Sequence, residues 1–222
     1  MAELFAVRHG QAAFGTDDYD RLTELGWQQA RWLGEYFAER RIGFRRVVTG
    51  TLRRHRETLA GVGESLRLDA EVLEHPGLNE YDSRAMLAAR VEALDERALA
   101  RDRRQYFRLL REALYEWARG RLVPPGHPSY ADFVAGVRDA FERIRADAAR
   151  APVLVVSSGG PISNLVGGLL SVPPAVTVDL NLQTRNTGIA QIAFNSSSAF
   201  VVSFNGVPHL DRPDRRHALT FS

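Results

Sequence analysis

Three short segments of the sequence combine side chains and backbone groups that could bind a doubly charged oxyanion. Arg8-His9-Gly10 directly follows an apolar run, residues 49–58 read TGTLRRHRET, and residues 157–160 read SSGG after another apolar run. Arginine offers bidentate hydrogen bonds to such an anion, and a glycine-rich helix start offers free backbone N–H groups. The His9 imidazole would stand beside the anion as a nucleophile, because its unperturbed pKa of about 6.5 leaves it largely neutral near pH 7.

Each segment also has an ordinary explanation. An Arg-His pair at a strand end can be a surface feature, TLRRHRET can be a solvated amphipathic helix, and SSGG can be a plain strand-to-helix turn. Their shared position favours a site, because ligands of open α/β sheets bind outside the carboxyl ends of the strands. The combination therefore predicts one anion-binding site assembled from three strand ends.

The first part of the chain alternates strand and helix patterns. One strand ends at Arg8, and after a loop Thr23 can cap a helix that Gly43 would stop. A second strand reads FRRVVTG (44–50), and a second helix is expected over 51–61. This β-α-β-α order predicts a parallel sheet covered by helices.

The rest of the chain completes the sheet. A short strand near 70–73 leads into the loop EHPGLNEYD, and the charged, helical stretch that follows predicts an insertion over about 82–130. The remaining expected elements are a helix from 129 to about 150, a strand after Pro152, a helix over 161–170, and strands over 188–194 and 199–204. The predicted fold is α/β, a three-layer α/β/α sandwich with a mostly parallel sheet, formed as a single domain over 1–222.

The composition narrows the chemistry. Cysteine is absent, which excludes disulfides and thiolate nucleophiles, and all 29 basic residues are arginine, which excludes lysine Schiff bases. The arginines are interleaved with Asp and Glu, and the formal net charge is +2, so no nucleic-acid partner is expected. The six histidines show no metal-ligand spacing, so we expect neither a metal nor another cofactor. Surface positions are expected for His127, His209 and His217.

The hydropathy pattern predicts no membrane partner, because no apolar run reaches the roughly 18–20 residues that span a bilayer. Only three residues precede the first strand, so we expect no signal peptide and a cytoplasmic location.

Several segments together resemble the histidine phosphatase superfamily, the phosphoglycerate-mutase-like fold. FAVRHGQ resembles its RHG strand end, DRLTELGWQQARWLGEYF its L-T-x-x-G-x-x-Q-A helix, and VVTGTLRRHRET its S-x-L-x-R-A-x-x-T-A segment. GLNE, VVSSGGPI, RNTGIAQI and NGVPHL resemble its acidic loop, its glycine turn, and its last strands and tail. The resemblance covers both ends of the chain and is weak over 83–128.

This resemblance implies roles for individual residues. His9 would be the nucleophile that forms a phosphohistidine, Arg8 and Arg54 would hold the phosphoryl oxygens, and Glu80 would be the general acid, its pKa raised to suit that task. Arg53 and Arg56 are then expected in solvent. Further phosphate contacts are expected from Ser158, Gly159 and Gln11, with Thr16 at the border and Asn186 as a distant supporter.

The chain departs from the family pattern at four places. Ser158 stands where the family has a second histidine, which costs a positive charge but keeps one hydrogen-bond donor. His55 occupies a small-residue position where the helix is expected to face the core, so it is not an obvious substitute. Thr49-Gly50-Thr51 replaces Ser-Ser-Pro, and the acidic loop lacks the G-x-x-E-G that often follows it.

We therefore expect a metal-independent phosphatase that hydrolyses a small phosphomonoester. The alternatives are a non-catalytic phosphoryl-binding or regulatory protein, to which Ser158 points, and a phosphoglycerate-type mutase. The expected partners are a small phosphorylated substrate and, as a candidate, a second copy of the chain in a homodimer.

Overall fold

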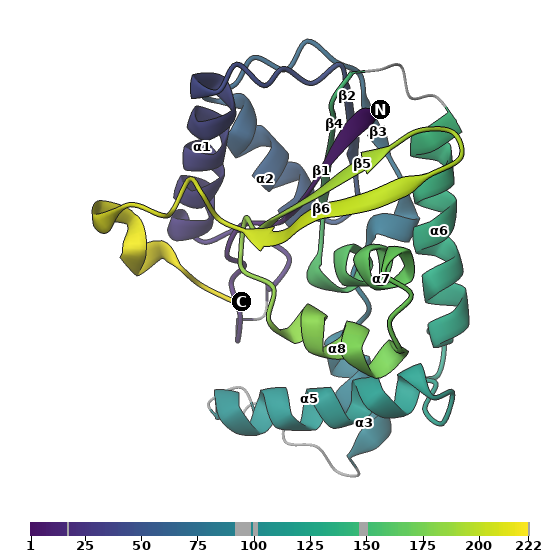
Figure 1. Ribbon diagram of the computed structural model, residues 1–222. Coiled ribbons are helices and arrows are strands. Elements are labelled where there is room, and N and C mark those ends of the chain that lie inside the picture. The colour runs from purple at the N-terminus through teal and green to yellow at the C-terminus, as the bar shows by residue number, and fades with distance from the viewer. Residues whose placement is uncertain (17, 92–98, 100–101, 147–150, 222) are drawn as a thin grey trace.

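The computed structural model describes residues 1–16, 18–91, 99, 102–146 and 151–221, and it contains a six-stranded sheet flanked by helices (Figure 1). The strands are β1 (Ala2–Arg8), β2 (Arg46–Thr49), β3 (Val72–Glu74), β4 (Val153–Ser157), β5 (Ile189–Phe194) and β6 (Ala199–Gly206). Their order is β3-β2-β4-β1-β5-β6. The β1, β2, β3 and β4 strands pair in parallel, whereas β5 is antiparallel to both β1 and β6.

Helices cover both faces of the sheet. One face carries α1 (Glu24–Glu39) and α2 (Arg53–Gly63), and the other carries α6 (Tyr130–Ala146) and α7 (Gly159–Leu169) (Figure 1). The helices α3 (Ser83–Arg90), α5 (Arg103–Ala118) and α8 (Pro174–Leu182) lie beyond the end of the sheet. Short 3-10 helices span Pro76–Leu78 and Pro213–Ala218. This arrangement confirms the predicted α/β fold with a mostly parallel sheet.

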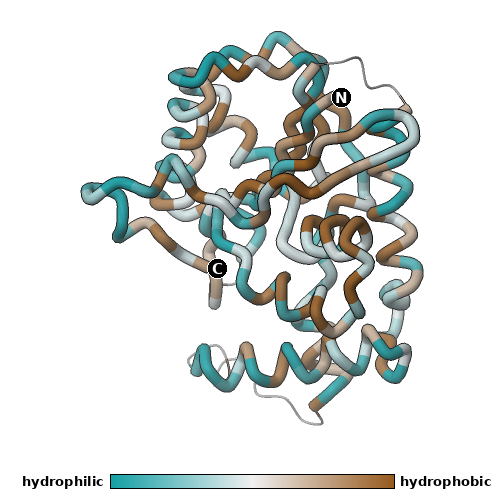
Figure 2. The backbone as a smooth tube through the Cα atoms, in the orientation of Figure 1, coloured by the Kyte–Doolittle hydropathy of each residue, from teal (hydrophilic) through white to brown (hydrophobic). Residues whose placement is uncertain are grey.

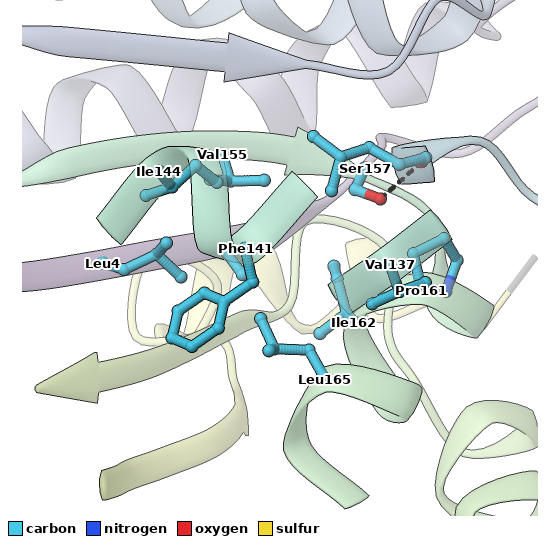
Figure 3. Close-up of a pocket in the computed structure, with 11 residues that line it drawn as sticks. Leu4, Val137, Phe141, Ile144, Val155, Ser157, Pro161, Ile162 and Leu165 are labelled. Atoms are coloured by element: carbon cyan, nitrogen blue, oxygen red, sulfur yellow. Dashed lines mark hydrogen bonds between the residues drawn. The ribbon is translucent and has the colours of Figure 1, made fainter. Parts of the chain in front are cut away.

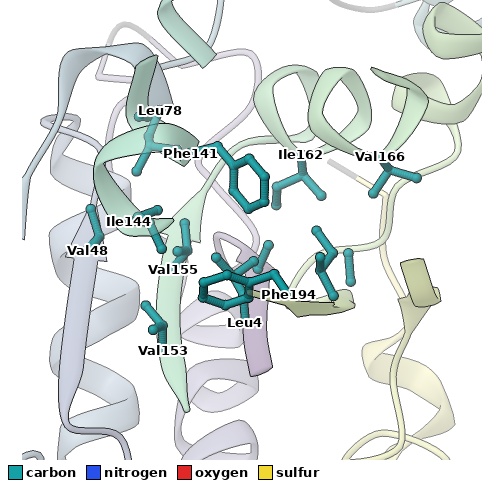
Figure 4. Packing of buried hydrophobic residues seen from close by; sticks show 14 of the residues in the cluster. Leu4, Val48, Leu78, Phe141, Ile144, Val153, Val155, Ile162, Val166 and Phe194 are labelled. Carbon is teal, nitrogen blue, oxygen red and sulfur yellow. The ribbon is translucent and has the colours of Figure 1, made fainter. Parts of the chain in front are cut away.

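Alternating side chains of the central strands build the two faces, because successive residues of a strand point to opposite sides. In β1, Leu4 packs with Phe141 of α6 and Phe194 on one face (Figure 4). The next residue, Phe5, packs edge-on against Phe37 of α1, with ring centroids 5.7 Å apart on the other face. Figure 2 shows hydrophobic residues concentrated along these central strands and along α7.

The helices of the expected insertion share a third apolar cluster. Leu114 and Trp117 of α5 pack with Met86 of α3, Phe133 of α6 and Val178 of α8. The Trp117 indole Nε1 also donates to the Pro128 carbonyl at 3.1 Å. The helical character expected for this region is confirmed, while residues 92–98 and 100–101 lie outside the described residues.

Several boundaries differ from the sequence expectations. Thr23 caps α1 as predicted, with its side chain accepting from Gly26 N–H, but the helix ends at Glu39, and Arg41 rather than Gly43 takes the left-handed conformation (φ 56°). The second helix begins at Arg53, two residues later than expected. The helix α8 was not predicted; its start follows Pro173 and Pro174, and no side chain caps it. Among the described residues, no helix is long and apolar enough to cross a membrane.

Candidate active site

The three predicted segments meet at one end of the sheet. The strands β2, β4 and β1 are neighbours, and their registers pair Arg8 with Ser157 and Thr49 with Val156. Parallel pairing in this register brings the residues after each strand to the same edge. The SSGG segment continues into α7, and the Arg-rich segment continues into α2. The site predicted from three separate stretches of sequence is therefore assembled in space.

His9 is held rigidly just beyond β1. The residue is 2% exposed, and its backbone N–H donates to the Ser157 carbonyl at 2.9 Å. Its Nδ1 lies 2.8 Å from the Gly10 carbonyl, which can only accept, so Nδ1 carries the proton and Nε2 keeps its lone pair. Burial lowers the pKa of His9 well below 6.5, and the charges of Arg54 and Arg8 lower it further. The imidazole is thus neutral, with an unprotonated Nε2.

Two guanidinium groups flank this imidazole. Arg8 is 8% exposed and Arg54 is 5% exposed, and the Nε atom of each is buried without a hydrogen-bond partner among the described residues. Arg8 uses Nη1 to donate to the carbonyls of Thr184 and Phe221, which fixes the side chain from the C-terminal segment. Buried donors are nearly always satisfied, and both arginines line the same pocket, so their two Nε–H groups leave hydrogen-bonding capacity for a ligand bound there.

Asp20 is a residue of this site that the sequence analysis did not identify. One carboxylate oxygen lies 2.8 Å from Arg54 Nη1, and the other accepts from the backbone N–H of Arg53 at 2.9 Å. Asp20 therefore holds the first turn of α2 and orients Arg54 at the same time. The Tyr19 ring lies 5.2 Å from the guanidinium carbon of Arg54 and packs against it. An Asp in a polar loop carries no pattern that would reveal this contact across 34 residues.

Glu80 faces the arginines from the loop after the first 3-10 helix. Its Oε2 accepts from the Gly160 N–H at 3.1 Å, at the start of α7. Burial raises the pKa of Glu80, although the Gly160 hydrogen bond and the charges of Arg54 and Arg8 oppose the rise. The expected upward shift is therefore confirmed, and a raised pKa suits a general acid.

A hydrogen bond from the end of β4 holds the loop that carries Glu80. The Ser157 hydroxyl at the end of β4 donates to the Leu78 carbonyl at 2.6 Å (Figure 3). Beneath this bond, Leu4, Phe141 and Ile162 help to enclose a small apolar cavity of about 10 Å³, so the support is closely packed. The position of Glu80 is thus tied to the same strand that leads into α7.

A pocket of about 410 Å³ opens over these groups. Its charged lining includes Arg8, Arg54 and Glu80. Six aromatic residues also line it: Phe14, Tyr19, Tyr81, Tyr106, Phe107 and Phe221. The Phe14 ring packs against two of the others, with ring centroids 5.0 Å from Tyr106 and 6.3 Å from Tyr19. His9 does not line the pocket but is buried beside the two arginines.

The other residues proposed from the sequence lie in different surroundings. Gln11 does not line the pocket, and its Oε1 accepts from the Thr23 hydroxyl at 2.8 Å. Gly159 packs so closely that a Cβ would lie 2.6 Å from Asn181 Oδ1, and Asn186 supports the site by donating from Nδ2 to the His9 carbonyl at 3.2 Å. Thr16 contacts the rim, where its carbonyl accepts from Arg84 at 3.1 Å.

The predicted solvent exposure is confirmed for two arginines and wrong for one histidine. Arg53 and Arg56 are confirmed there, since each side chain is 55% exposed and paired with an acidic neighbour. The surface position expected for His209 is wrong: it is 2% exposed, and its Nε2 lies 2.8 Å from the Thr187 hydroxyl. His209 lies in the tail, and a tail sequence does not show whether it packs back onto its own domain.

His55 faces inward and contacts the site. It is fully buried, as expected for a residue facing inward, but its Nε2 lies 2.7 Å from the Ser158 hydroxyl. Its ring centroid is 5.8 Å from that of His9. The expected inward position of His55 is therefore confirmed, and in addition the side chain contacts Ser158 and lies next to His9.

The chain is similar in sequence to proteins of one superfamily. Residues 4–206 match the sequence model of the histidine phosphatase superfamily (branch 1). A bifunctional protein of Mycobacterium tuberculosis (strain ATCC 25618 / H37Rv) is 30% identical over 211 residues, which cover 91% of this chain and 54% of that protein. The chain thus spans about half the length of this curated relative.

Two solved structures share the fold. A mycobacterial glucosyl-3-phosphoglycerate phosphatase superposes with a TM-score of 0.67 at 24% identity, covering 93% of this chain and 99% of that chain. A phosphoserine phosphatase from Entamoeba histolytica gives a TM-score of 0.68 at 19% identity, covering 95% of this chain and 100% of that chain. Both likenesses agree with the α/β architecture described above.

Proposed function

The chain belongs to the histidine phosphatase superfamily (branch 1), and from this premise we propose that it hydrolyses a small phosphomonoester through a phosphohistidine on His9, without a metal ion. Arg8 and Arg54 supply the positive charge for the phosphoryl oxygens, and Glu80 serves as the general acid. These roles match the neutral His9 imidazole, the unpaired guanidinium donors and the raised pKa of Glu80.

The proposed reaction has two steps. In the first, the lone pair of His9 Nε2 attacks phosphorus, the ester P–O bond breaks, and protonated Glu80 gives its proton to the leaving alkoxide. In the second, water attacks the phosphohistidine, the P–N bond breaks, and the Glu80 carboxylate takes the proton from water. Inorganic phosphate then leaves, and His9 returns to its neutral form. Arg8 and Arg54 hold the non-bridging oxygens through both steps.

The observation that carries this proposal is the pair of buried Nε–H donors that have no acceptor within the described part of the chain, next to an imidazole whose unprotonated nitrogen is Nε2. The test is hydrolysis of p-nitrophenyl phosphate over about pH 5 to 8 in the presence of EDTA. Turnover should disappear in His9→Ala and fall strongly in Arg54→Ala. The matched control is Arg53→Ala, the neighbouring arginine on the exposed face of α2, which should retain full activity.

Trapping the intermediate separates covalent catalysis from simple hydrolysis. We expect a phosphoramidate signal in ³¹P NMR when the wild-type enzyme is mixed with substrate and quenched in alkali, and none in His9→Ala. Turnover without such an intermediate in burst-phase or quench measurements would contradict the covalent route.

The aromatic lining of the pocket supports a substrate whose alcohol carries an apolar or aromatic part. Phe14, Tyr106 and Phe107 would cover that part while the phosphoryl group meets the arginines. A naphthyl phosphate should therefore have a lower KM than glycerol phosphate, and Phe14→Ala should narrow that difference. Phe200→Ala, which removes an exposed ring on β6, is the control. Equal KM values for the two esters would contradict this assignment.

A second candidate function is phosphoryl binding without turnover. It is favoured by Ser158, which stands where the family has a second histidine and supplies no positive charge to the transferred group. Under this alternative, the wild type binds inorganic phosphate in calorimetry but releases no p-nitrophenol, and His9→Ala binds phosphate as well as the wild type.

A further inference from the structure

Three of the positions at which the sequence departs from the family pattern are in direct contact. His55 lies between Gly50 and Ser158, although these residues come from α2, the end of β2 and the end of β4. The contacts run from the Gly50 backbone to the imidazole and from the imidazole to the Ser158 hydroxyl. Separate substitutions at three unrelated positions would not be expected to meet in this way.

The Ser158 hydroxyl is committed to His55. Ser158 is the N-cap residue of α7, a position at which a serine hydroxyl commonly accepts from the first turn of the helix. Here no such capping bond forms, and the hydroxyl lies 2.7 Å from His55 Nε2 instead. Both side chains are fully buried, so solvent does not compete for this bond.

Gly50 makes room for the imidazole. A Cβ at position 50 would lie 2.2 Å from His55 Nδ1 and 2.7 Å from Cε1, distances that no real packing tolerates. Any other residue there would displace the ring or the strand end. The glycine is therefore a requirement of a histidine at position 55.

The same ring lies next to the proposed nucleophile. The ring centroids of His55 and His9 are 5.8 Å apart, and the rings are inclined by 36°. Arg54, the adjacent residue of α2, flanks His9 from the same helix. The helix thus presents a guanidinium and an imidazole together to the group that His9 would receive.

We propose that His55, seated against Gly50, positions the Ser158 hydroxyl so that the pair acts as one hydrogen-bond donor to the phosphoryl group transferred to His9. The proposal rests on the hydrolysis proposed above. It explains how this chain compensates for the family histidine that is replaced by serine at position 158. In this arrangement the second imidazole of the site comes from α2 instead of the turn after β4. Ser158 contacts the phosphoryl oxygen, and His55 is a positioning residue.

The direction of the hydrogen bond follows from this role. The imidazole could be either partner of the Ser158 hydroxyl, but only the tautomer with a proton on Nε2 leaves the hydroxyl proton free for a phosphoryl oxygen. Burial, followed by the charge of Arg54, lowers the pKa of His55 to about 3 against an opposing backbone hydrogen bond at Gly50, so the ring is neutral at working pH. The bound phosphoryl group must therefore draw the imidazole proton from the Gly50 side to Nε2 for the pair to act as proposed. The pair therefore offers a polarised neutral donor, and Arg8 and Arg54 supply the charge.

The test is a set of variants assayed for p-nitrophenyl phosphate hydrolysis and, by calorimetry, for inorganic phosphate affinity. His55→Ala and Ser158→Ala should each lower kcat by about 10²-fold, the loss typical of one preorganised donor, and the double variant should lose no more than either single one. The double variant His55→Ala/Ser158→His should recover activity, because the removed ring vacates the space for the new one. Arg56→Ala, one residue along α2 and exposed, is the control.

Ser158→His alone should not raise activity above that of the wild type, because His55 already occupies the space next to the Ser158 hydroxyl. Gly50→Ala should mimic His55→Ala in the wild type and have little further effect in the His55→Ala background. Independent, multiplying losses from His55→Ala and Ser158→Ala would overturn the proposal. So would full activity of a folded His55→Ala protein.

The outcomes for the two proposals can be told apart. Loss of turnover in His9→Ala, with both His55→Ala and Ser158→Ala as active as Arg56→Ala, would keep hydrolysis and overturn the pair. A wild type that binds phosphate without turnover, and loses affinity equally in the two variants, would keep the pair and overturn hydrolysis. No hydrolysis and no phosphate binding would overturn both.

A measurement on the wild type avoids any folding defect of the variants. In ¹⁵N NMR of histidine-labelled protein, His55 should carry its proton on Nε2 in the phosphate complex, and the signal should shift when inorganic phosphate is added, in proportion to site occupancy. A proton on Nδ1 in the phosphate complex would overturn the proposed donor direction.

Discussion

The Glu80 carboxylate lies 3.1 Å from the backbone N–H of Gly160, so the acid proposed for the leaving group rests on the N-terminus of α7. This contact stabilises the ionised carboxylate, whereas burial favours the protonated acid and dominates. The balance suits a group that must release a proton in one step and accept one in the next. It also places a negative charge where a phosphate dianion would approach.

Glu80→Gln should separate these two effects. The variant cannot donate a proton, so kcat should fall by about 10²–10⁴-fold for an alkyl phosphate and much less for p-nitrophenyl phosphate, whose leaving group needs little protonation. Removal of the carboxylate should also increase the affinity for inorganic phosphate above the pKa of Glu80. Steady-state kinetics with both esters and phosphate calorimetry measure these effects; equal losses for the two esters would argue against an acid role.

The pH dependence of kcat/KM should show two limbs. The rate should fall with acid as His9 takes up a proton, at a pH well below 6.5 because burial and the two arginines lower its pKa. It should fall with base as Glu80 loses its proton, at a pH above 4.5 because burial raises its pKa.

The basic limb of that profile identifies Glu80. In Glu80→Gln it should disappear while the acidic limb remains. A basic limb that persists unchanged in the variant would mean that another group supplies the proton.

Asp20 should control the affinity of the site through Arg54. In Asp20→Asn the guanidinium loses its anionic partner at 2.8 Å, and the first turn of α2 loses a charged acceptor. We expect KM to rise about 2- to 5-fold with a smaller change in kcat, because the Asp20 carboxylate is 39% exposed and solvent screens its pair with Arg54 to about 0.2–1 kcal/mol. The control is Asp69→Asn, which removes an exposed ion pair with Arg67 outside the pocket. Equal KM values in the two variants would contradict a positioning role for Asp20.

The sequence reveals those parts of the site that local patterns encode. The positions of Arg8 and His9 were predictable because they end an apolar strand. The position of Arg54 was predictable because its spacing from Leu52 and Thr58 matches the superfamily's S-x-L-x-R-A-x-x-T-A segment. The contact of the His55 side chain with Ser158 could not be predicted, because it depends on whether the Gly50 backbone leaves room for the ring. The contact is made between residues that three different elements bring together, and no helical periodicity encodes it.

The same limit explains Asp20 and His209. Asp20 lies 34 residues from Arg54, in a polar loop whose path the sequence does not specify. His209 lies in a tail that reads as exposed, yet the tail packs back against α1, where Arg215 reaches Glu35 at 3.0 Å. Long-range contacts of loops and tails depend on the completed fold, whereas strand ends and helix caps depend on neighbours in sequence.

His209 should make the protein sensitive to acid. Burial, followed by the charge of Arg215, lowers its pKa to about 3 in the folded state, against about 6.5 in the unfolded chain. Between these values the unfolded chain binds the additional proton, so the free energy of unfolding should decrease as pH falls from 6.5 towards 3. The slope for one such histidine approaches about 1.4 kcal/mol per pH unit. Above pH 6.5 this contribution to the pH dependence ends.

Urea unfolding of the wild type and His209→Gln at several pH values would measure this slope. The variant should be less stable at pH 7, because it loses the fitted imidazole and its 2.8 Å contact with Thr187, but its stability should decline less steeply with acid. His217→Gln, which removes an exposed histidine of the same segment, is the control. Parallel curves for the wild type and His209→Gln between pH 6.5 and 4 would show that His209 is not held neutral by the fold, since only a depressed pKa in the folded state generates the extra slope.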